Sequence, residues 1–410
     1  MTVAINLDRL RRTLEELGRL GRDANGGVSR PSFSKADLEA RAWLKEKVED
    51  AGLAYLVDGA GNIFGRLESV AGGRTVMAGS HIDTVLHGGM FDGAVGVLAA
   101  LECLQTIRDE GLRLSKPLSL AAFTDEEGNL VGDFLGSRAF IGALDREFLE
   151  QGTTSFGVPL RDVLRNTDFT IESILAAHES TPEIEAFLEL HIEQGPTLDD
   201  EGISVGLVDI IPGKHYRWCS FVGEAGHAGT VPLELRRDAF LGLADFALRS
   251  TQHVATHHYG NFVTIGKVRV APGVFSVIPG RADFSFEFRS RLKTTLAALE
   301  KELFALAADI ATTRGLMFLS KVMDTTDPVA VPERLLSLLK AECETLGYPS
   351  LVLPSGAGHD AQILAAKTDT AMIFIPSPDG VSHAPQESIR WDDLNKGANV
   401  LLSALMKLAS

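Results

Sequence analysis

Three short, largely apolar runs in this chain each end at a histidine or at acidic residues. The runs are Thr75–Gly79, Leu118–Phe123 and Glu185–Leu190. Runs of this length suit strands that are buried on both faces, and such strands are typical of parallel sheets. Helical patterns alternate with them along the chain, at residues 7–20, 34–51 and 93–110. The sequence therefore predicts an α/β domain with a mostly parallel sheet.

The pattern changes near Gly213 and returns near Thr325. Between these positions the predicted elements follow the order strand, helix, strand, strand, helix, strand. Their ranges are 215–223, 233–251, 262–270, 282–289, 294–313 and 317–323. This is the order of a ferredoxin-like module. We therefore expect a catalytic domain in two pieces, residues 1–211 and 326–410, interrupted by an inserted α+β lid domain at 212–325.

Length and charge limit the classes of protein that fit. The chain has 410 residues, which favours two domains over one. Its formal net charge of −16 argues against nucleic acid and anionic membranes as partners, because both need a basic surface. Three widely spaced cysteines support neither a disulfide framework nor a thiolate metal site. Neither a signal peptide nor a membrane-spanning run is recognisable, so we expect a cytoplasmic protein.

Side chains that can bind a metal gather where the predicted strands end. His81, Glu126, Glu127 and His191 each follow one of the three runs, His383 lies in the loop at 376–385, and Asp92 would cap the helix at 93–110. The carboxyl ends of parallel strands meet at one edge of a sheet. Imidazoles and carboxylates are the ligands that zinc prefers. The sequence therefore predicts a two-metal site at this edge.

Adjacent carboxylates suggest a division of labour within the site. Glu126 and Glu127 would point to opposite sides of an extended chain, so that one binds metal and the other acts as general base. Asp83, two residues after His81, would accept a hydrogen bond from the free N–H of that imidazole. Each residue alone also fits a structural histidine, a solvated acidic pair or a helix cap. Their occurrence together favours a metal-dependent hydrolase.

Eight motifs extend this interpretation. They are SHIDTVLHGGMFDGAVGVLAALE, FTDEEG, GSRAFIG, LELHIEQGP, GHAGTVPLELRRDA, VIPGRADFSFEFR, SGAGHDAQ and IFIPSPDGVSHAPQE. In number, order and spacing they resemble the amidase/hydantoinase-carbamoylase branch of the M20 metallopeptidase superfamily. This branch contains N-carbamoyl-L-amino acid hydrolases, allantoate amidohydrolases, ureidoglycolate amidohydrolases and β-ureidopropionases. The resemblance is more specific for the branch than for the substrate.

The resemblance implies a co-catalytic pair of divalent metal ions. His81 and His191 would hold one ion, Glu127 and His383 the other, and Asp92 would bridge them. Glu126 would be the general base that deprotonates the attacking water. Related peptidases generally have a carboxylate where this chain has His191, which favours the amidohydrolase branch. Zinc is the default ion, while manganese, cobalt and nickel suit the same ligands.

The resemblance also implies which residues bind the substrate. His227 matches a histidine that stabilises the oxyanion and is delivered across a homodimer interface formed by the lid. Arg289 matches the arginine that clamps a substrate carboxylate, although read alone it could pair with Glu287 or Asp283. Further polar substrate contacts match Gln194, His359 and the turn that includes Gly358.

Ser276 departs from the pattern of the branch. Well-known members usually have Asn at this position, thirteen residues before the clamping arginine. Serine is shorter and cannot supply both the donor and the acceptor of an amide. The departure opens the substrate range to a bulkier or differently substituted amide.

The sequence thus predicts a metal-dependent amidohydrolase. Its substrate would be a small carboxylate with a linear amide or ureido group, such as an N-carbamoyl-L-amino acid or allantoate. The alternatives within the superfamily are an N-acyl amino acid deacylase and a dipeptidase. A non-catalytic binding protein of the same fold is disfavoured, because all five ligand positions and the base position are filled.

Overall fold

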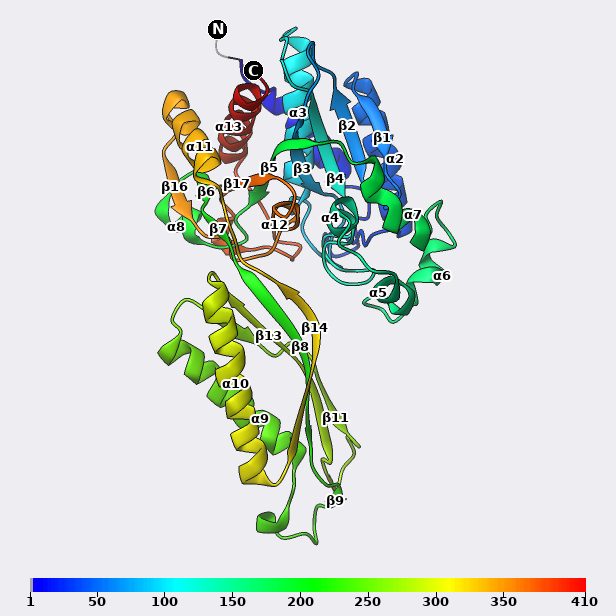
Figure 1. Ribbon diagram of the computed structural model, residues 1–410, viewed down its shortest axis with the longest axis vertical. Helices are drawn as coiled ribbons and strands as arrows, with labels where there is room; N and C mark the ends of the chain where they lie inside the picture. Colours follow the sequence, from blue (N-terminus) through cyan, green and yellow to red (C-terminus); the bar gives the residue numbers. More distant parts are fainter. Residues whose placement is uncertain (1–2) are drawn as a thin grey trace. The chain divides into compact units, whose positions relative to one another are not determined.

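The computed structural model describes residues 3–410, which form two compact units (Figure 1). Of the described residues, unit 1 comprises 3–209 and Ala330–Ser410, and unit 2 comprises Ile210–Val329. The breaks between them fall within a few residues of the predicted domain ends at 211 and 326.

Unit 1 is built on an eight-stranded sheet with the order β1-β2-β4-β3-β5-β17-β6-β16. The strands are β1 (Ala54–Val57), β2 (Ile63–Leu67), β3 (Thr75–His81), β4 (Leu118–Phe123), β5 (Ile184–Ile192), β6 (Val205–Val208), β16 (Ser350–Leu353) and β17 (Asp369–Ile375). The four central strands run parallel, whereas β1, β2 and the β17–β6 pair contribute antiparallel contacts. The predicted α/β class with a mostly parallel sheet is confirmed.

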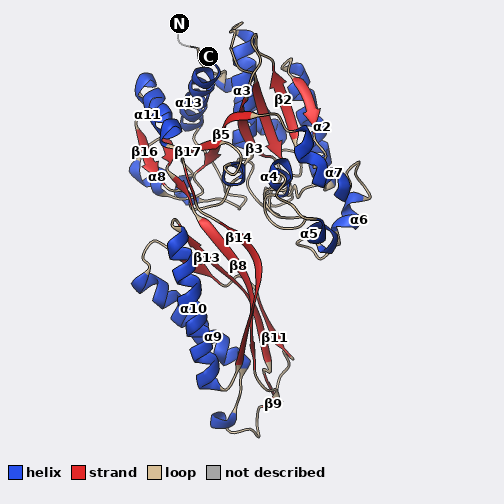
Figure 2. Cartoon of the chain, in the orientation of Figure 1, coloured by secondary structure: helices blue, strands red, loops and turns tan. Residues whose placement is uncertain are grey.

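Helices cover both faces of this sheet (Figure 2). They are α1 (Leu7–Leu17), α2 (Lys35–Asp50), α3 (Ala94–Asp109), α4 (Leu135–Ile141), α5 (Arg146–Gln151), α6 (Leu160–Leu164), α7 (Ile171–Ala176), α8 (Thr197–Glu201), α11 (Glu333–Leu346), α12 (Asp360–Leu364) and α13 (Trp391–Ala409). Strand side chains alternate between faces. Ala186 and Leu188 of β5 join the core formed with α3 and α13, while Phe187 between them meets the ring of Phe123, 5.9 Å away.

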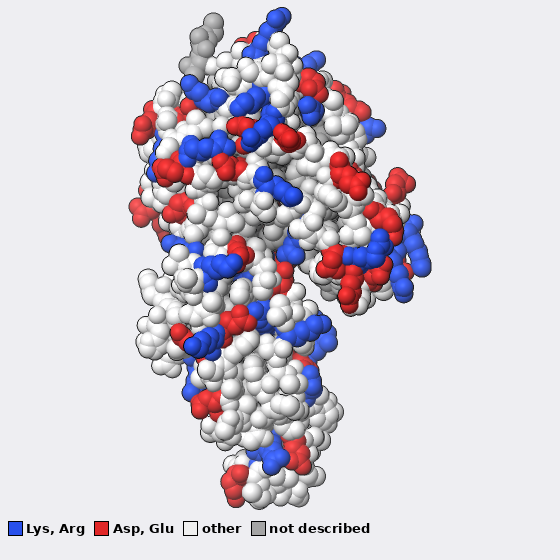
Figure 3. Space-filling model, viewed as in Figure 1, with Lys and Arg blue, Asp and Glu red and all other residues white. Residues whose placement is uncertain are grey.

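Helix α3 is apolar and buried around nearly its whole circumference, because it packs on β3, β4 and β5 and is covered by α1 and α13. A helix that is apolar all round is expected only in such a position. Among the described residues, no helix has the length and apolar character needed to cross a membrane. Figure 3 shows acidic and basic side chains interspersed on the visible face, without a large basic patch there.

Unit 2 is an antiparallel sheet with two helices. It contains β8 (Gly213–Val222), α9 (Ala239–His257), β10 (Phe262–Thr264), β11 (Val268–Ala271), β13 (Arg281–Ser290), α10 (Lys293–Arg314) and β14 (Met317–Thr326). The strand order is β10-β13-β8-β14, and β11 also pairs with β13. Two ribbons complete the unit, β9 (Gly226–His227) with β12 (Val277–Ile278) and β7 (Ile210–Ile211) with β15 (Val329–Ala330). This arrangement is ferredoxin-like.

Two predicted elements of unit 2 differ from the structure. The helix expected at 233–251 begins only at Ala239, because Asp238 caps it by accepting hydrogen bonds from the N–H groups of Phe240 and Leu241. The strand expected at 262–270 is two strands, since the N–H of Lys267 bonds to the Ser285 hydroxyl and the ladder is interrupted there.

Candidate metal centre

Two histidines at the carboxyl edge of the unit 1 sheet form the base of the site. His81 ends β3 and His191 lies at the end of β5, and these two strands are parallel neighbours. Both side chains are only 1% exposed, and their ring centroids are 6.1 Å apart. The Nδ1 atom of His191 contacts the Ile192 carbonyl at 2.9 Å, which leaves Nε2 directed into the site.

Asp92 lies between the imidazoles and does not cap the helix. The predicted capping role is wrong, because Gly93 is the N-cap of α3 and no side chain makes the capping hydrogen bond. Instead, Asp92 Oδ1 lies 3.1 Å from Nε2 of His191 and 3.6 Å from Nε2 of His81. Its other oxygen, Oδ2, lies 3.2 Å from Nε2 of His383. The two oxygens therefore face different histidines.

These contacts define two ligand triads that share one carboxylate. His81, Asp92 and His191 form one triad, and Asp92, Glu127 and His383 form the other. Within each triad the ligand atoms lie within 4.8 Å of one another. Each triad mixes imidazole nitrogen with carboxylate oxygen, the donor set of zinc and of neighbouring divalent ions. The residues present fit a pair of cations bridged by Asp92.

Two neutral side chains also bind Asp92. The Nε2 of Gln194 donates to Asp92 Oδ2 at 2.7 Å, and the Ser382 hydroxyl donates to the same oxygen at 2.9 Å. The Oε1 atom of Gln194 is buried and has no hydrogen-bond partner among the described residues. An unsatisfied buried acceptor beside the triads points to a ligand that binds at this position.

Glu126 and Glu127 lie in a turn after β4, and the extended geometry expected for them is wrong. The turn follows Asp125, which has a φ of 59° and accepts the N–H groups of Asn129 and Leu130. Glu126 Oε2 lies 3.7 Å from Nε2 of His81, and Glu127 Oε1 lies 3.6 Å from Nε2 of His383. The Glu126 carboxylate thus faces His81, and the Glu127 carboxylate faces His383.

Asp83 holds this turn in place. Its carboxylate accepts the backbone N–H groups of Glu126 and Glu127 at 3.4 and 3.3 Å. The expected bond from the His81 ring to the Asp83 carboxylate is replaced, because the ring Nδ1 lies 3.0 Å from the backbone carbonyl of Asp83 and 3.8 Å from its carboxylate. Asp83 therefore orients His81 through its backbone and the two glutamates through its side chain.

The charges of the site depend strongly on one another. Burial would raise the pKa of Asp92, but the imidazoles of His191, His383 and His81 hold it well below its ordinary value. The hydrogen bond to Asp92 raises the pKa of His383 to about 9. Burial, reinforced by the charge of Asp92, raises the pKa of Glu127 to about 7. In the absence of metal ions, protons bound to His383 and Glu127 offset the negative charge of the carboxylates. Bound cations would offset the same negative charge.

Burial also raises the pKa of Glu126 well above its ordinary value. The neighbouring carboxylates of Glu127, Asp360 and Asp92 act in the same direction, and His81 acts against them. A carboxylate with a raised pKa is a stronger base than a solvated one. Glu126 is therefore suited to accepting a proton from a water molecule.

Sequence reasoning missed two acidic residues that support the ligands. Glu189 accepts the Ser80 hydroxyl at 2.6 Å and the N–H of Ala361 at 2.9 Å. Glu387 Oε1 accepts the backbone N–H groups of Phe91 and Asp92 at 2.8 and 3.1 Å. The signal for Glu189 was a lone acid in an apolar strand, two residues before a ligand. Glu387 gave no comparable signal beyond its closeness to His383 in sequence.

His359 is buried beside His191. It is 1% exposed, its ring centroid lies 4.6 Å from that of His191, and its Nε2 lies 3.0 Å from the Ser355 hydroxyl. The ring of His359 therefore packs against His191, and its predicted contact with a substrate stays a prediction. Gly358 is closely packed, since a Cβ there would lie 2.9 Å from the Phe134 ring.

In unit 2, His227 and Ser276 lie together. His227 of β9 pairs with Val277 of β12, and the N–H of Ala228 donates to the Ser276 carbonyl at 2.9 Å. The Nδ1 of His227 accepts the N–H of Gly229 at 3.0 Å. In a neutral imidazole the proton then resides on Nε2, which makes that atom a hydrogen-bond donor.

Arg289 lies at the other end of the same sheet. Strand β13 starts at Arg281, beside the β9–β12 ribbon, and Arg289 is eight residues further along. At ~3.3 Å per residue this places Arg289 about 26 Å along β13 from Arg281, and Ser276 precedes Arg281 in the chain. The guanidinium of Arg289 forms an ion pair with Glu287, one of the two acids considered from the sequence. Asp283 instead bonds to Ser220 and Arg281.

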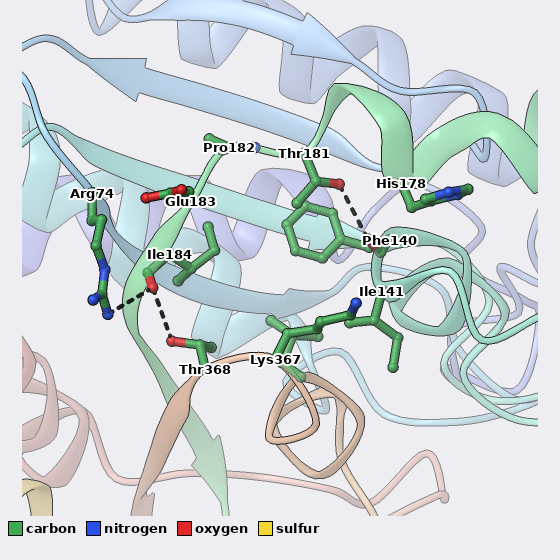
Figure 4. Close-up of a pocket in the computed structure, with 11 residues that line it drawn as sticks. Arg74, Phe140, Ile141, His178, Thr181, Pro182, Glu183, Ile184, Lys367 and Thr368 are labelled. Atoms are coloured by element: carbon green, nitrogen blue, oxygen red, sulfur yellow. Dashed lines mark hydrogen bonds between the residues drawn. The ribbon is translucent and has the colours of Figure 1, made fainter.

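A cavity of about 530 Å³ in unit 1 lies away from the metal ligands (Figure 4). It is lined by Ile184 at the start of β5, whereas His191 lies at the other end of that strand. The hydroxyls of Thr181 and Thr368 that line it bond to the carbonyls of Phe140 and Ile184. The cavity thus lies at the opposite end of β5 from His191, and none of its lining residues belongs to either triad.

Comparison with known proteins agrees with the fold. The sequence profile of peptidase family M20/M25/M40 matches residues 77–407. An N-carbamoyl-L-amino acid amidohydrolase of Geobacillus stearothermophilus is 35% identical over 404 residues, which cover 98% of both chains. An allantoate amidohydrolase of Escherichia coli (strain K12) is 33% identical over 405 residues, 97% of both.

A crystal structure of an amidase of the hydantoinase/carbamoylase family from Burkholderia vietnamiensis superimposes with a TM-score of 0.90 at 31% identity. It covers 100% of this chain and 98% of that one. The chain belongs to the M20 metallopeptidase family, whose members are metal-dependent. Within it, these relatives place the chain in the amidase/carbamoylase branch. The predicted family and the predicted hydrolase class are confirmed.

Proposed function

We propose that the protein is a two-metal amidohydrolase that cleaves the linear amide or ureido C–N bond of a small carboxylate. The observation that carries the proposal is the position of Asp92, whose two oxygens serve the two ligand triads. Unit 1 would be the catalytic domain, and unit 2 would be the lid and dimerisation domain.

The chemistry follows from which groups can bind, polarise and move a proton. When bound by His81, His191, Glu127, His383 and Asp92, two divalent cations would polarise the scissile carbonyl and make a water molecule more acidic. Glu126 takes a proton from the attacking water as the new C–O bond forms. It then passes that proton to the leaving nitrogen as the C–N bond breaks.

The substrate side of the proposal rests on unit 2 and on the motifs that it shares with the branch. Arg289 would hold the carboxylate in a bidentate pair, and His227 Nε2 would donate to the developing oxyanion. In one chain Arg289 lies about 26 Å along β13 from Arg281, at the end of the strand that follows the β9–β12 ribbon of His227. A small substrate cannot span that distance, so we propose that His227 comes from a second copy of the chain.

A homodimer through unit 2 is consistent with its surface. Strand β14 lies at one edge of the sheet, and β10 lies at the other. Large apolar side chains are exposed on both, including Val322 at 57% and Phe262 at 64%. Exposed apolar side chains on open sheet edges are typical of interaction surfaces.

N-carbamoyl-L-amino acids and allantoate are the first substrates to test, because relatives of similar identity carry both names. The panel should add ureidoglycolate, N-acyl amino acids and dipeptides, each assayed with zinc-, manganese-, cobalt- and nickel-loaded enzyme. Turnover confined to dipeptides or acyl amino acids would overturn the substrate class. In the same assay, Glu126→Gln should lower kcat by about 10²–10⁴-fold with metal content unchanged.

Trans delivery of His227 has a direct test. His227→Ala and Glu126→Gln should each be inactive alone. If His227 acts in the partner's site, an equal mixture of the two variants recovers about a quarter of wild-type activity, because half of the dimers carry one intact site. Absence of any recovery after subunit exchange, with dimers verified by light scattering, would contradict the proposal.

A further inference from the structure

We propose that unit 2 contains an additional divalent-metal site, formed by His253, His258 and Glu302. His253 lies in α9 and His258 follows its last residue, while Glu302 lies in α10. One ligand atom from each of the three residues lies within 4.8 Å of the other two. The site shares no residue with the triads of unit 1.

Two imidazoles converge on one carboxylate oxygen. Nε2 of His253 and Nε2 of His258 each lie 2.7 Å from Oε2 of Glu302. These bonds lower the pKa of Glu302, so its carboxylate is ionised at neutral pH. Two nitrogens and one anionic oxygen that face a common point are a ligand set for zinc, copper, nickel or cobalt.

The tautomers of the two imidazoles can adapt to a cation. Among the described residues, no hydrogen bond holds Nδ1 of His253 or of His258. Each ring can therefore keep its proton on Nδ1 and present the lone pair of Nε2 to a metal ion. The hydrogen bonds seen between the rings and Glu302 would then be exchanged for metal–ligand bonds.

The three ligand atoms can also move apart by the small distance that a bound cation requires. Metal–ligand bonds of about 2.0–2.1 Å in tetrahedral geometry require ligand atoms about 3.3 Å apart, somewhat more than the present spacing. His258 has left the helical conformation, with φ −132° and ψ 52°, and the Glu302 side chain is 42% exposed. Both can therefore shift outward, and the remaining coordination positions would be filled by water.

A cation at this point would join the carboxyl end of α9 to α10. The two helices pack against each other on the sheet of unit 2, and α9 ends at this cluster. Three ligands and open water positions distinguish the site from a closed structural zinc site. We therefore expect exchangeable binding that stabilises the helix pair.

The test measures metal stoichiometry of the full-length protein. Chelator-treated protein is dialysed against buffered Zn²⁺, and bound zinc is measured by mass spectrometry. Wild type should bind one more equivalent than His253→Ala/His258→Ala. The matched control is His257→Ala, whose ring lies 4.8 Å from that of His253 but is outside the triad. It should retain the additional equivalent.

The same comparison in an Asp92→Asn background separates this site from the catalytic one. There the one-equivalent difference should persist whether or not the proposed two-metal mechanism is correct. Glu302→Gln is a second variant in case the double variant folds poorly, and it should weaken the additional binding at least tenfold. Equal stoichiometry and equal affinity in wild type, the double variant and Glu302→Gln would overturn the proposal and leave only a hydrogen-bonded cluster.

Discussion

The carboxylate of Glu387 accepts the backbone N–H of Asp92 at 3.1 Å and so fixes the residue that both ligand triads share. It also accepts the N–H of Phe91, and its Oε2 lies 3.2 Å from the hydroxyl of Ser382, which donates its proton to Asp92. Burial raises the pKa of Glu387 to about 7, and the nearby Asp92 charge contributes. A side chain outside the ligand set therefore determines where the bridging carboxylate lies.

Glu387→Ala should weaken metal binding although Glu387 is not a ligand in either triad. The change leaves two buried N–H groups without an acceptor and releases Asp92. Loss of such an outer contact typically lowers metal affinity by about 10–100-fold. Competition with a chelator of known affinity measures the change, with the exposed Glu344→Ala as control. Unaltered affinity in a folded Glu387→Ala protein would show that Asp92 needs no such support.

The two triads predict different metal losses. His383→Ala removes a ligand from one triad only, so unit 1 should retain one of its two cations. Asp92→Asn removes the shared carboxylate and should lower the affinity for both. Metal analysis after dialysis distinguishes the two outcomes. Equal losses in the two variants would argue against a bridging role for Asp92.

The parallel sheet and its ligand-bearing edge could be predicted from the sequence, because buried strands that end in histidine or acid leave few alternatives. His81 and His191 follow from this logic alone. The role of Asp92 needed the structure. A helix-cap pattern and a bridging ligand look the same in sequence, whereas in the structure Gly93 takes the N-cap position and the Asp92 carboxylate lies beside the imidazoles.

Other misses share a physical cause, which is contact between distant segments. Glu387 bonds to a backbone N–H group 295 positions away, and His359 packs on His191 across the sheet edge. Local periodicity carries no information about such pairs. The turn at Glu126 was missed because Asp125 adopts a left-handed conformation that is uncommon for residues other than glycine.

Metal-free protein should become less stable as the pH rises. The pKa of Glu127 is raised by burial to about 7 and that of His383 by its bond to Asp92 to about 9, so folding favours their protonated forms. In the unfolded chain the pKa values are about 4.3 for glutamate and 6.5 for histidine. A raised pKa stabilises the folded protein fully below the unfolded-state pKa, and this stabilisation is lost as the pH rises through the folded-state pKa. Asp92 has a lowered pKa and opposes this trend only at acid pH, below about 4.

Scanning calorimetry with a chelator should therefore give a higher unfolding temperature at about pH 5.5 than at about pH 8.5. Added zinc should reverse the trend, since metal ions bind the deprotonated ligands and stabilise the protein most where those ligands have lost their protons. A flat profile for the chelated protein would mean that the ligands do not face one another in solution.

Gly93 is predicted to be indispensable for the site because of a single close approach. Its φ is 63°, and a Cβ there would lie 2.4 Å from Nε2 of His81. Gly93→Ala should therefore displace the imidazole and abolish metal-dependent turnover. Gly111 has the same φ of 63° with no atom within 4 Å of its hypothetical Cβ, so Gly111→Ala carries the backbone strain alone. That control should be destabilised by about 1–2 kcal/mol and remain active. Equal activity losses in the two variants would assign the effect to backbone strain.

Ser276 offers the sharpest test of substrate range. It is exposed and has a φ of 63°, a conformation that asparagine adopts more readily than serine. Ser276→Asn should therefore stabilise unit 2 slightly, by less than about 1 kcal/mol.

An asparagine amide would also add the donor and acceptor that serine cannot both supply. We expect kcat/KM for N-carbamoyl amino acids to rise relative to bulkier amides, by about tenfold for 1.4 kcal/mol of added binding. Ser276→Ala is the control that changes the hydroxyl alone. If Ser276→Asn raises the unfolding temperature but leaves the ratio of kcat/KM values unchanged, Ser276 does not contact the substrate.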